Sequence, residues 1–180
     1  LDKIVEKVRN RNLFFSSDIK KNIEESQMIF IAVNTPTAES GPAKGMGADL
    51  TNVIQTAKEI AKYSKTPKII VEKSTLPVRT AEKLKEILDK YGNTDFDIIS
   101  NPEFLAEGTA IKDLFKSDRV LIGGASTIRG KKATKQLMNI YLKWIPKSRI
   151  LLTNVWSSEL SKLASNAMLA QRISSINSLS

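Results

Sequence analysis

The sequence predicts an α/β layer sandwich, in which helices flank a parallel sheet, followed by one long helix. Two observations support this fold class. Short apolar runs alternate with helical patterns along residues 28–152, and near-continuous apolar runs are typical of strands that are buried on both faces. From about Asn154 no strand signal follows, and only three charged residues remain in the sequence.

Five apolar runs are the expected strands, and three amphipathic stripes between them are the expected helices. The strands are residues Met28–Val33, Lys68–Glu72, Asp97–Ser100, Arg119–Ile122 and Arg149–Leu152. The stripes, each expected to face the sheet, consist of Val53, Ile54, Ala57, Ile60 and Ala61, then of Leu84, Ile87, Leu88 and Tyr91, and finally of Leu137, Ile140, Tyr141 and Trp144. Pro77 marks the entry to the second helix, and Gly92 marks its end.

Residues 154–180 fit one long, mostly buried helix, which would run roughly 40 Å at about 1.5 Å per residue. Its many small side chains would let another helix approach closely, so we expect a connection into a second domain or an oligomer seam. We therefore divide the chain into one domain at residues 1–153 and the start of a helical domain at residues 154–180. Because the sequence opens inside an amphipathic pattern at Leu1 and stops inside a helix at Ser180, we expect a fragment of a longer protein.

The residue types that are present limit the chemistry. The 180 residues include no Cys and no His, which excludes disulfides, thiolate or imidazole metal sites, cysteine nucleophiles and histidine bases. We therefore expect no metal. No apolar run approaches the roughly 20 residues that span a bilayer, and no leader pattern opens the sequence, so we expect a cytoplasmic protein with no membrane partner.

The excess of positive charge lies late in the sequence. Of 28 Lys and Arg and 19 Asp and Glu in total, residues 101–150 hold 10 and 4. Four of these cations lie at the start of the third helix, where the helix dipole disfavours positive charge: Arg129, Lys131, Lys132 and Lys135. They indicate either an anionic neighbour or a helix that merely tolerates the unfavourable charge. Because aromatic residues do not interleave with them and charge runs usually face solvent, we expect no nucleic-acid partner.

Polar side chains follow the first two strands, where ligands of doubly wound sheets bind. The first loop reads Val33, Asn34, Thr35, Pro36, Thr37, and the second contains Ser74, Thr75 and Leu76. Their hydroxyls, amide and backbone donors are candidates to hold a phosphate or a ribose. The alternatives are an ordinary proline-containing turn for the first loop and a simple helix cap for Ser74 or Thr75.

The loop after the third strand carries two carboxylates, Glu103 and Glu107, four residues apart and next to apolar Phe104 and Leu105. If the segment is helical, both lie on one face. Like charges this close in a partly dry site would raise one pKa and equip that carboxyl as a general base. The alternative is a pair of surface carboxylates.

Lys162 and Asn166 are spaced to share one face of the last helix, which is otherwise almost uncharged. One interpretation is a salt bridge from Lys162 to Glu159. The other is an ammonium and an amide that together stabilise a developing oxyanion.

Several strings taken together resemble one known family. FIAVNTPT, EKSTLPVR, SNPEFLAEGTAIKDL, DRVLIGG and WSSELSKLASNAMLAQRISSINS, in this order and spacing, resemble the UDP-glucose/GDP-mannose dehydrogenase family, and within it the UDP-glucose 6-dehydrogenases, over nearly the whole chain. The resemblance implies the later part of an NAD-binding Rossmann domain, followed by the long dimerising helix of a central helical domain. It also implies an intact homo-oligomer that oxidises UDP-glucose to UDP-glucuronate in two steps with two NAD⁺, through a thioester on a cysteine.

The resemblance further implies roles for individual residues. Val33–Thr37 and Ser74–Leu76 would contact NAD, and Glu107 would approach its nicotinamide end. The UDP-glucose site would be lined by Glu103, Phe104, Leu105, Ala106, Glu107, Lys162, Leu163, Ala164, Ser165 and Asn166. Thr75 and Glu103 would position and deprotonate the water that hydrolyses the thioester, while Lys162, helped by Asn166, would stabilise oxyanionic intermediates.

The departures from the family pattern leave alternatives open. The Gly-rich loop for the pyrophosphate, the acidic residue for the adenosine ribose and the catalytic cysteine have no counterpart here, so we expect these 180 residues alone to be inactive. A dehydrogenase for another nucleotide sugar is one alternative. A truncated, non-catalytic relative that binds intact subunits through residues 154–180 is another.

Overall fold

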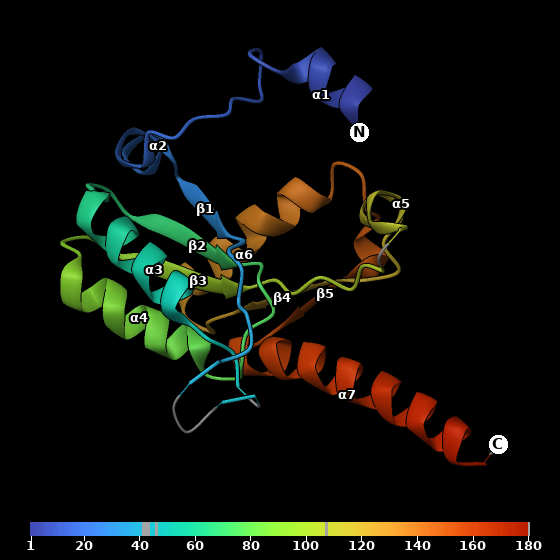
Figure 1. Cartoon of the computed structure of the whole chain (residues 1–180). Coiled ribbons are helices and arrows are strands. Elements are labelled where there is room, and N and C mark those ends of the chain that lie inside the picture. The colour runs from blue at the N-terminus through green and yellow to red at the C-terminus, as the bar shows by residue number, and fades with distance from the viewer. Residues whose placement is uncertain (41–43, 46, 107, 180) are drawn as a thin grey trace.

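A computed structural model describes residues 1–40, 44–45, 47–106 and 108–179 and contains one five-stranded sheet with helices on both faces (Figure 1). The strands are β1 (Met28–Ile31), β2 (Lys68–Glu72), β3 (Phe96–Ser100), β4 (Val120–Gly124) and β5 (Ile150–Thr153). The helices are α1 (Asp2–Val8), α2 (Ile19–Glu25), α3 (Thr51–Tyr63), α4 (Thr80–Tyr91), α5 (Ala110–Phe115), α6 (Ile128–Tyr141) and α7 (Val155–Leu179), with a 3₁₀ turn at Lys147–Arg149. The α/β class and all five expected strands are confirmed.

The sheet is not wholly parallel, and that expectation was wrong. The strands follow the order β1-β2-β3-β4-β5, and β3 pairs antiparallel with β4 while the other neighbours are parallel. Only the carboxyl ends of the two strands meet, through Ile99 with Gly124 and Ser100 with Gly123. A parallel pair needs a crossover that packs on the sheet. Between β3 and β4 the chain supplies only the short α5, none of whose residues is buried.

Two apolar cores lie on the two faces of the sheet. On one face, α3 and α4 pack side by side and bury the core of their stripes, including Val53, Ala57, Ile60, Ala61, Leu84 and Leu88. On the other face α6 contributes Ala133, Leu137 and Tyr141. The stripes therefore face the sheet as expected, except at their edges, where Tyr91, Ile140 and Trp144 are exposed.

Gly92 ends α4, as expected, and its lack of a side chain is required for packing. A Cβ at this position would lie 2.6 Å from the ring of Phe96, the first residue of β3. A real Cβ never comes so close, so only glycine lets β3 pass directly under the end of the helix.

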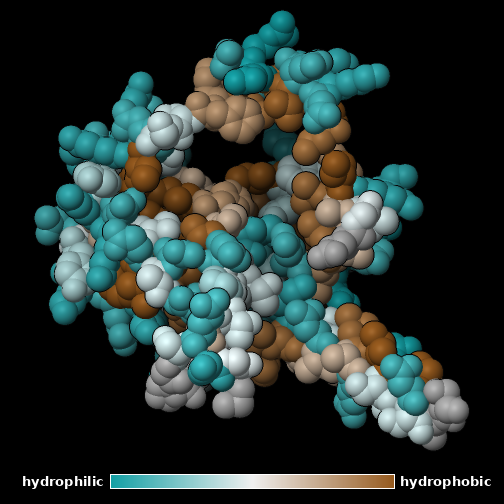
Figure 2. Space-filling model, viewed as in Figure 1, coloured by the Kyte–Doolittle hydropathy of each residue, from teal (hydrophilic) through white to brown (hydrophobic). Residues whose placement is uncertain are grey.

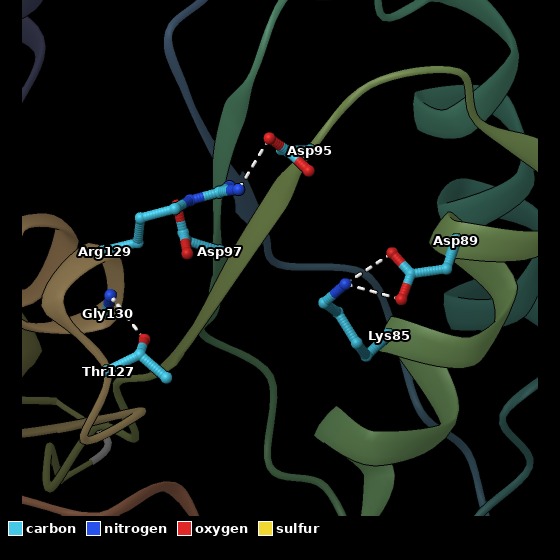
Figure 3. Close-up of polar contacts among 7 residues, drawn as sticks. All are labelled: Lys85, Asp89, Asp95, Asp97, Thr127, Arg129 and Gly130. Carbon is cyan, nitrogen blue, oxygen red and sulfur yellow. Dashed lines mark hydrogen bonds and ion pairs between the residues drawn. The ribbon is translucent and has the colours of Figure 1, made fainter.

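Of the four cations at the start of α6, Arg129 has anionic neighbours (Figure 3), while Lys131, Lys132 and Lys135 are exposed. The Arg129 guanidinium contacts Asp95 at 2.6 Å and Asp97 at 3.1 Å, both beside or on β3. Thr127 caps the helix by accepting a hydrogen bond from the Gly130 N–H at 3.1 Å. Arg129 thus ties α6 to the neighbouring strand.

The long final helix is present but is mostly exposed, which corrects the expectation of burial. Among residues 155–178 of α7, whose burial is described, only Ser158 and Glu159 are buried, whereas Leu160, Met168, Leu169, Ile173 and Ile176 are each more than half exposed. The helix projects from the sheet, with apolar side chains along it (Figures 1 and 2). Apolar residues lie all around this helix and not along one stripe, and the described residues of the chain leave most of them exposed. None of the helices in the described ranges is long and apolar enough to cross a membrane.

Candidate functional site

The two polar loops after β1 and β2 lie against each other at the carboxyl edge of the sheet. The Ser74 hydroxyl donates a hydrogen bond to the Val33 carbonyl at 2.7 Å, and the Thr35 hydroxyl donates one to the Thr75 carbonyl at 3.4 Å. The Asn52 amide on α3 holds the Asn34 carbonyl at 3.1 Å. The expected proximity of the two loops is therefore confirmed, and Thr75 is exposed beside them.

The start of α4 is held by α7, not by Ser74 or Thr75. The helix begins at Thr80, and the buried Glu159 carboxylate accepts hydrogen bonds from the N–H groups of Arg79 at 2.8 Å and Ala81 at 2.9 Å. The interpretation of Ser74 or Thr75 as the cap of this helix is wrong. The salt bridge between Glu159 and Lys162 is likewise absent from the ion pairs of the described residues.

Arg79, directly before α4, has a left-handed backbone with φ 76°. A non-glycine residue adopts this region only when its surroundings hold it there. Its N–H is bound to Glu159, its side chain pairs with Glu82 at 2.8 Å, and the guanidinium lies 5.7 Å from the Trp156 ring. The Trp156 indole in turn donates to Glu82 at 2.9 Å, so the beginnings of α4 and α7 are joined at several points.

The loop after β3 is anchored by Asn101. This fully buried amide donates to the Leu121 carbonyl at 2.8 Å and accepts from the Tyr141 hydroxyl at 2.6 Å, while its backbone N–H binds the Glu72 carbonyl at 2.9 Å. Residues 101–106 are not helical, so the helical spacing assumed for the two carboxylates does not apply. Glu107 lies outside the described residues, so the expectation that one carboxyl of this pair acts as a general base stays a prediction.

Glu103 faces a lysine that the sequence analysis did not assign. The Lys73 ammonium lies 3.9 Å from the Glu103 carboxylate and donates to the Asn101 carbonyl at 3.3 Å. Burial lowers the pKa of Lys73, Glu103 opposes this shift, and the positive charge of Lys162 adds to it. Lys73, Glu103 and Lys162 therefore form one charge cluster where β2, β3 and α7 meet.

The loop after β3 and the face of α7 enclose a cleft of about 610 Å³. Its walls include six of the residues expected in the substrate site: Phe104, Leu105, Ala106, Lys162, Ser165 and Asn166. The Lys162 ammonium lies 5.4 Å from the centre of the Phe104 ring, and the Arg119 guanidinium lies 4.6 Å from it. Glu103, Leu163 and Ala164 are not among the lining residues, and Glu107 lies outside the described residues.

Further cations in this cleft were missed by the sequence analysis. Lys112, Lys116 and Arg119 line it, together with the acidic Asp113 and Asp118. The signal available in the sequence was the basic excess of residues 101–150, which was interpreted as a solvated face. A cleft with this many cations and one aromatic ring suits an anionic ligand with an apolar part.

A second, very small cavity lies where the residues at the ends of β2 and β3 meet the start of α7. It measures about 10 Å³ and is lined by Glu72, Ser74, Thr75, Leu76, Ser100, Pro102, Glu159 and Lys162. Thr75 and Lys162 thus meet here, while Asn166 lies one turn further along α7 in the larger cleft. Glu72, like Lys73, had no predicted role in the site. Its burial and, secondarily, the charge of Glu159 raise its pKa to about 8.

No cluster of three or more Asp or Glu side chains close enough to hold a metal ion occurs in the described parts of the chain.

Comparisons with known proteins identify relatives of the whole chain. The model of the UDP-glucose/GDP-mannose dehydrogenase family, NAD binding domain, matches residues 1–145. The chain is 59% identical over 182 residues to the UDP-glucose 6-dehydrogenase of Drosophila melanogaster and 56% identical over 181 residues to UDP-glucose 6-dehydrogenase 5 of Oryza sativa subsp. japonica. Both alignments cover 100% of this chain and 38% of the relative, so the chain spans well under half of their length.

Solved structures share the fold. A UDP-glucose dehydrogenase from Pyrobaculum islandicum superposes with a TM-score of 0.83 at 30% identity, over 99% of this chain and 39% of that one. A GDP-mannose dehydrogenase from Pseudomonas aeruginosa superposes with a TM-score of 0.79 at 25% identity, over 90% of this chain and 36% of that one.

Proposed function

This chain belongs to the UDP-glucose/GDP-mannose dehydrogenase family, and we propose that the complete protein oxidises UDP-glucose to UDP-glucuronate with NAD⁺. One observation supports this substrate above others: the identity of 53–59% to UDP-glucose 6-dehydrogenases extends over 100% of the chain. The family includes dehydrogenases of other nucleotide sugars, such as the GDP-mannose enzyme, at much lower identity. UDP-glucose is therefore the proposed substrate, and another nucleotide sugar is the alternative.

NAD is the cofactor of the domain family that residues 1–145 match, and the residues present fit part of it. Val33–Thr37 and Ser74–Leu76 lie side by side at the carboxyl edge, and Thr75 is exposed there. The hydroxyls of these two loops suit a ribose and the nicotinamide end of the dinucleotide. No Gly-x-Gly-x-x-Gly loop occurs in the sequence, so the pyrophosphate needs donors from elsewhere. When bound, NAD supplies the hydride acceptor.

We assign the sugar-nucleotide to the 610 Å³ cleft between the loop at residues 103–106 and the face of α7. The Lys162 ammonium, beside the Phe104 ring, is placed to stabilise negative charge that develops on a reacting oxygen. Asn166 on the same wall adds an amide donor. Glu103 is partly exposed and paired with Lys73. It is the proposed base that deprotonates the water that hydrolyses the thioester, and Thr75 helps to position this water.

The same proposal accounts for the exposed apolar helix. With no partner in the chain, the side chains of α7 from Leu160 onward suit a contact with a second subunit. Residues 1–153 then form the later part of the NAD-binding domain, and residues 154–180 begin a helical domain that joins subunits. The cytoplasm is the proposed location of this homo-oligomer.

The test is turnover by the purified complete protein. With UDP-glucose and NAD⁺ it should form two NADH per sugar, followed by absorbance, and UDP-glucuronate should appear by chromatography. GDP-mannose at the same concentration is the control and should give little NADH. Equal turnover of GDP-mannose would contradict the substrate assignment, and no turnover of either would contradict the activity.

A further inference from the structure

Glu72 is a buried acid whose carboxyl group lacks a hydrogen-bond partner among the residues that the structure describes. It is the last residue of β2, is 2% exposed, and pairs in register with Ile31 of β1 and Ser100 of β3. An isolated carboxylate in such a place is very costly, whereas a neutral carboxylic acid costs much less.

The neighbouring Glu159 has the opposite environment. Each of its oxygens accepts a backbone N–H, from Arg79 at 2.8 Å and Ala81 at 2.9 Å. Hydrogen bonds to a carboxylate favour its charged form, and two adjacent buried charges of one sign disfavour each other. Geometry therefore assigns the negative charge of this pair to Glu159 and a proton to Glu72.

No ion pair among the described residues includes Glu72, although the Lys162 side chain lines the same small cavity. The charged groups on the elements around it are Glu159 and Lys162 on α7, Lys73 after β2, Glu103 after β3, and Arg79 and Glu82 at the start of α4. Lys73 is engaged by Glu103 and Asn101, and Arg79 by Glu82. The adjoining cavity of about 10 Å³ has room for about one water molecule, which cannot hydrate a carboxylate.

The seat of α7 is the part of the structure that an ionised Glu72 would disturb. Ser158 packs so closely on β4 that a Cβ on Gly123 would lie 2.4 Å from its own Cβ, and its hydroxyl donates to the Ser100 carbonyl at 3.2 Å. Glu159 follows directly, and Lys162 lies one turn later on the same helix. Any repulsion between Glu72 and Glu159 therefore acts on the helix that carries Lys162.

We propose that Glu72 is a positioning residue: it keeps a proton inside the folded protein, so that Glu159 stays seated on α4 and Lys162 stays in the substrate cleft. The inference rests on the proposed function, because it concerns the placement of Lys162. The raised pKa of Glu72, at about 8, agrees with this assignment. Ionisation of Glu72 at alkaline pH would push Glu159 away and displace Lys162.

Two measurements on the complete protein test the proposal. Infrared spectra with isotope-labelled glutamate should show the carbonyl band of a protonated carboxylic acid at neutral pH in the wild type and in Glu82→Gln, but not in Glu72→Gln. Glu82 is the matched control because it is an exposed carboxylate at the same junction of α4 and α7. If Glu72→Gln does not fold, Glu72→Met, of similar length and without a charge, replaces it.

The second measurement is the pH profile of kcat at saturating UDP-glucose and NAD⁺. Above about pH 8, wild-type kcat should fall by up to about tenfold per pH unit, with a smaller change in KM, while Glu72→Gln should show a distinctly smaller fall. Coincident profiles, or no difference in the infrared band, would overturn the inference while leaving the proposed function intact. A wild type that forms no NADH would instead contradict the proposed function, and the infrared band would still decide the protonation of Glu72.

Discussion

The buried Glu72 makes the stability of the protein depend on pH with a predictable sign. Its pKa is raised from 4.5 to about 8 in the folded state, so the native protein keeps this proton over a pH range in which the unfolded chain has lost it. The contribution of Glu72 to the free energy of unfolding is therefore largest below about pH 4.5. It falls as the pH rises toward about 8, where Glu72 ionises in the native state as well. Replacing Glu72 by Gln removes the ionisation and should remove this fall.

The size of the effect follows from the same two values. The unfolded chain is ionised and the folded protein is not from about pH 4.5 to pH 7, an interval of roughly 2.5 pH units. At about 1.4 kcal/mol for each pH unit, the unfolding free energy falls by an amount on the order of 3 kcal/mol. Urea unfolding of the complete protein at a series of pH values measures it, with Glu82→Gln as control. The wild type should lose about 3 kcal/mol more than Glu72→Gln over this range, whereas equal slopes would refute the assignment of the proton to Glu72.

Three further predictions concern the site. Lys162→Ala should lower kcat by about 10²–10³-fold with little change in UDP-glucose affinity or melting temperature. Glu159→Ala should instead lower the melting temperature, because α4 loses a buried cap that is typically worth about 0.5–2 kcal/mol. Equal losses of stability in the two variants with intact turnover would refute the catalytic role of Lys162. Glu103→Gln should slow thioester hydrolysis by about 10²–10⁴-fold, so a covalent adduct should accumulate in rapid-quench experiments; slow turnover without adduct would contradict the role of Glu103. Residues 1–180 alone should bind NAD⁺ weakly or not at all in calorimetric titration, and micromolar binding would show that Val33–Thr37 and Ser74–Leu76 suffice without a Gly-rich loop.

The sequence predicted the elements that carry a local signal. Each strand begins and ends within two residues of its expected bounds, because a run such as KIIVE reports burial on both faces directly. The two polar loops were also expected side by side, since the carboxyl ends of parallel strands share one edge, whereas the proximity of Phe104 and Lys162 was expected only from the resemblance to the family.

What the sequence could not predict depends on contacts between distant segments. An apolar run does not indicate strand direction, so the antiparallel pairing of β3 with β4 was missed. Glu159 reaches N–H groups 80 and 78 residues away in the chain, and no local pattern distinguishes that contact from a pairing with Lys162 on its own helix. Glu72 and Lys73 were passed over for the same reason, because their burial depends on where α7 crosses the sheet.

The exposure of α7 has a different cause. Its composition is that of a buried helix, with few charges and many apolar and small residues, and this was recognised correctly as a feature of the sequence. Burial, however, needs a partner surface, and within the described residues only the first turns of the helix touch the sheet. The composition of a helix thus indicates whether it needs a partner but not whether the same chain provides one.

The most direct test of this account is a crystal structure of the complete protein with UDP-glucose and NAD⁺. The account predicts that the glucose lies between the loop at residues 103–106 and the face of α7, with the Lys162 ammonium within hydrogen-bond distance of the reacting sugar oxygen. It also predicts the nicotinamide beside Ser74–Leu76. A nucleotide sugar bound away from this cleft, or a Lys162 side chain turned from the sugar in the bound complex, would contradict the site.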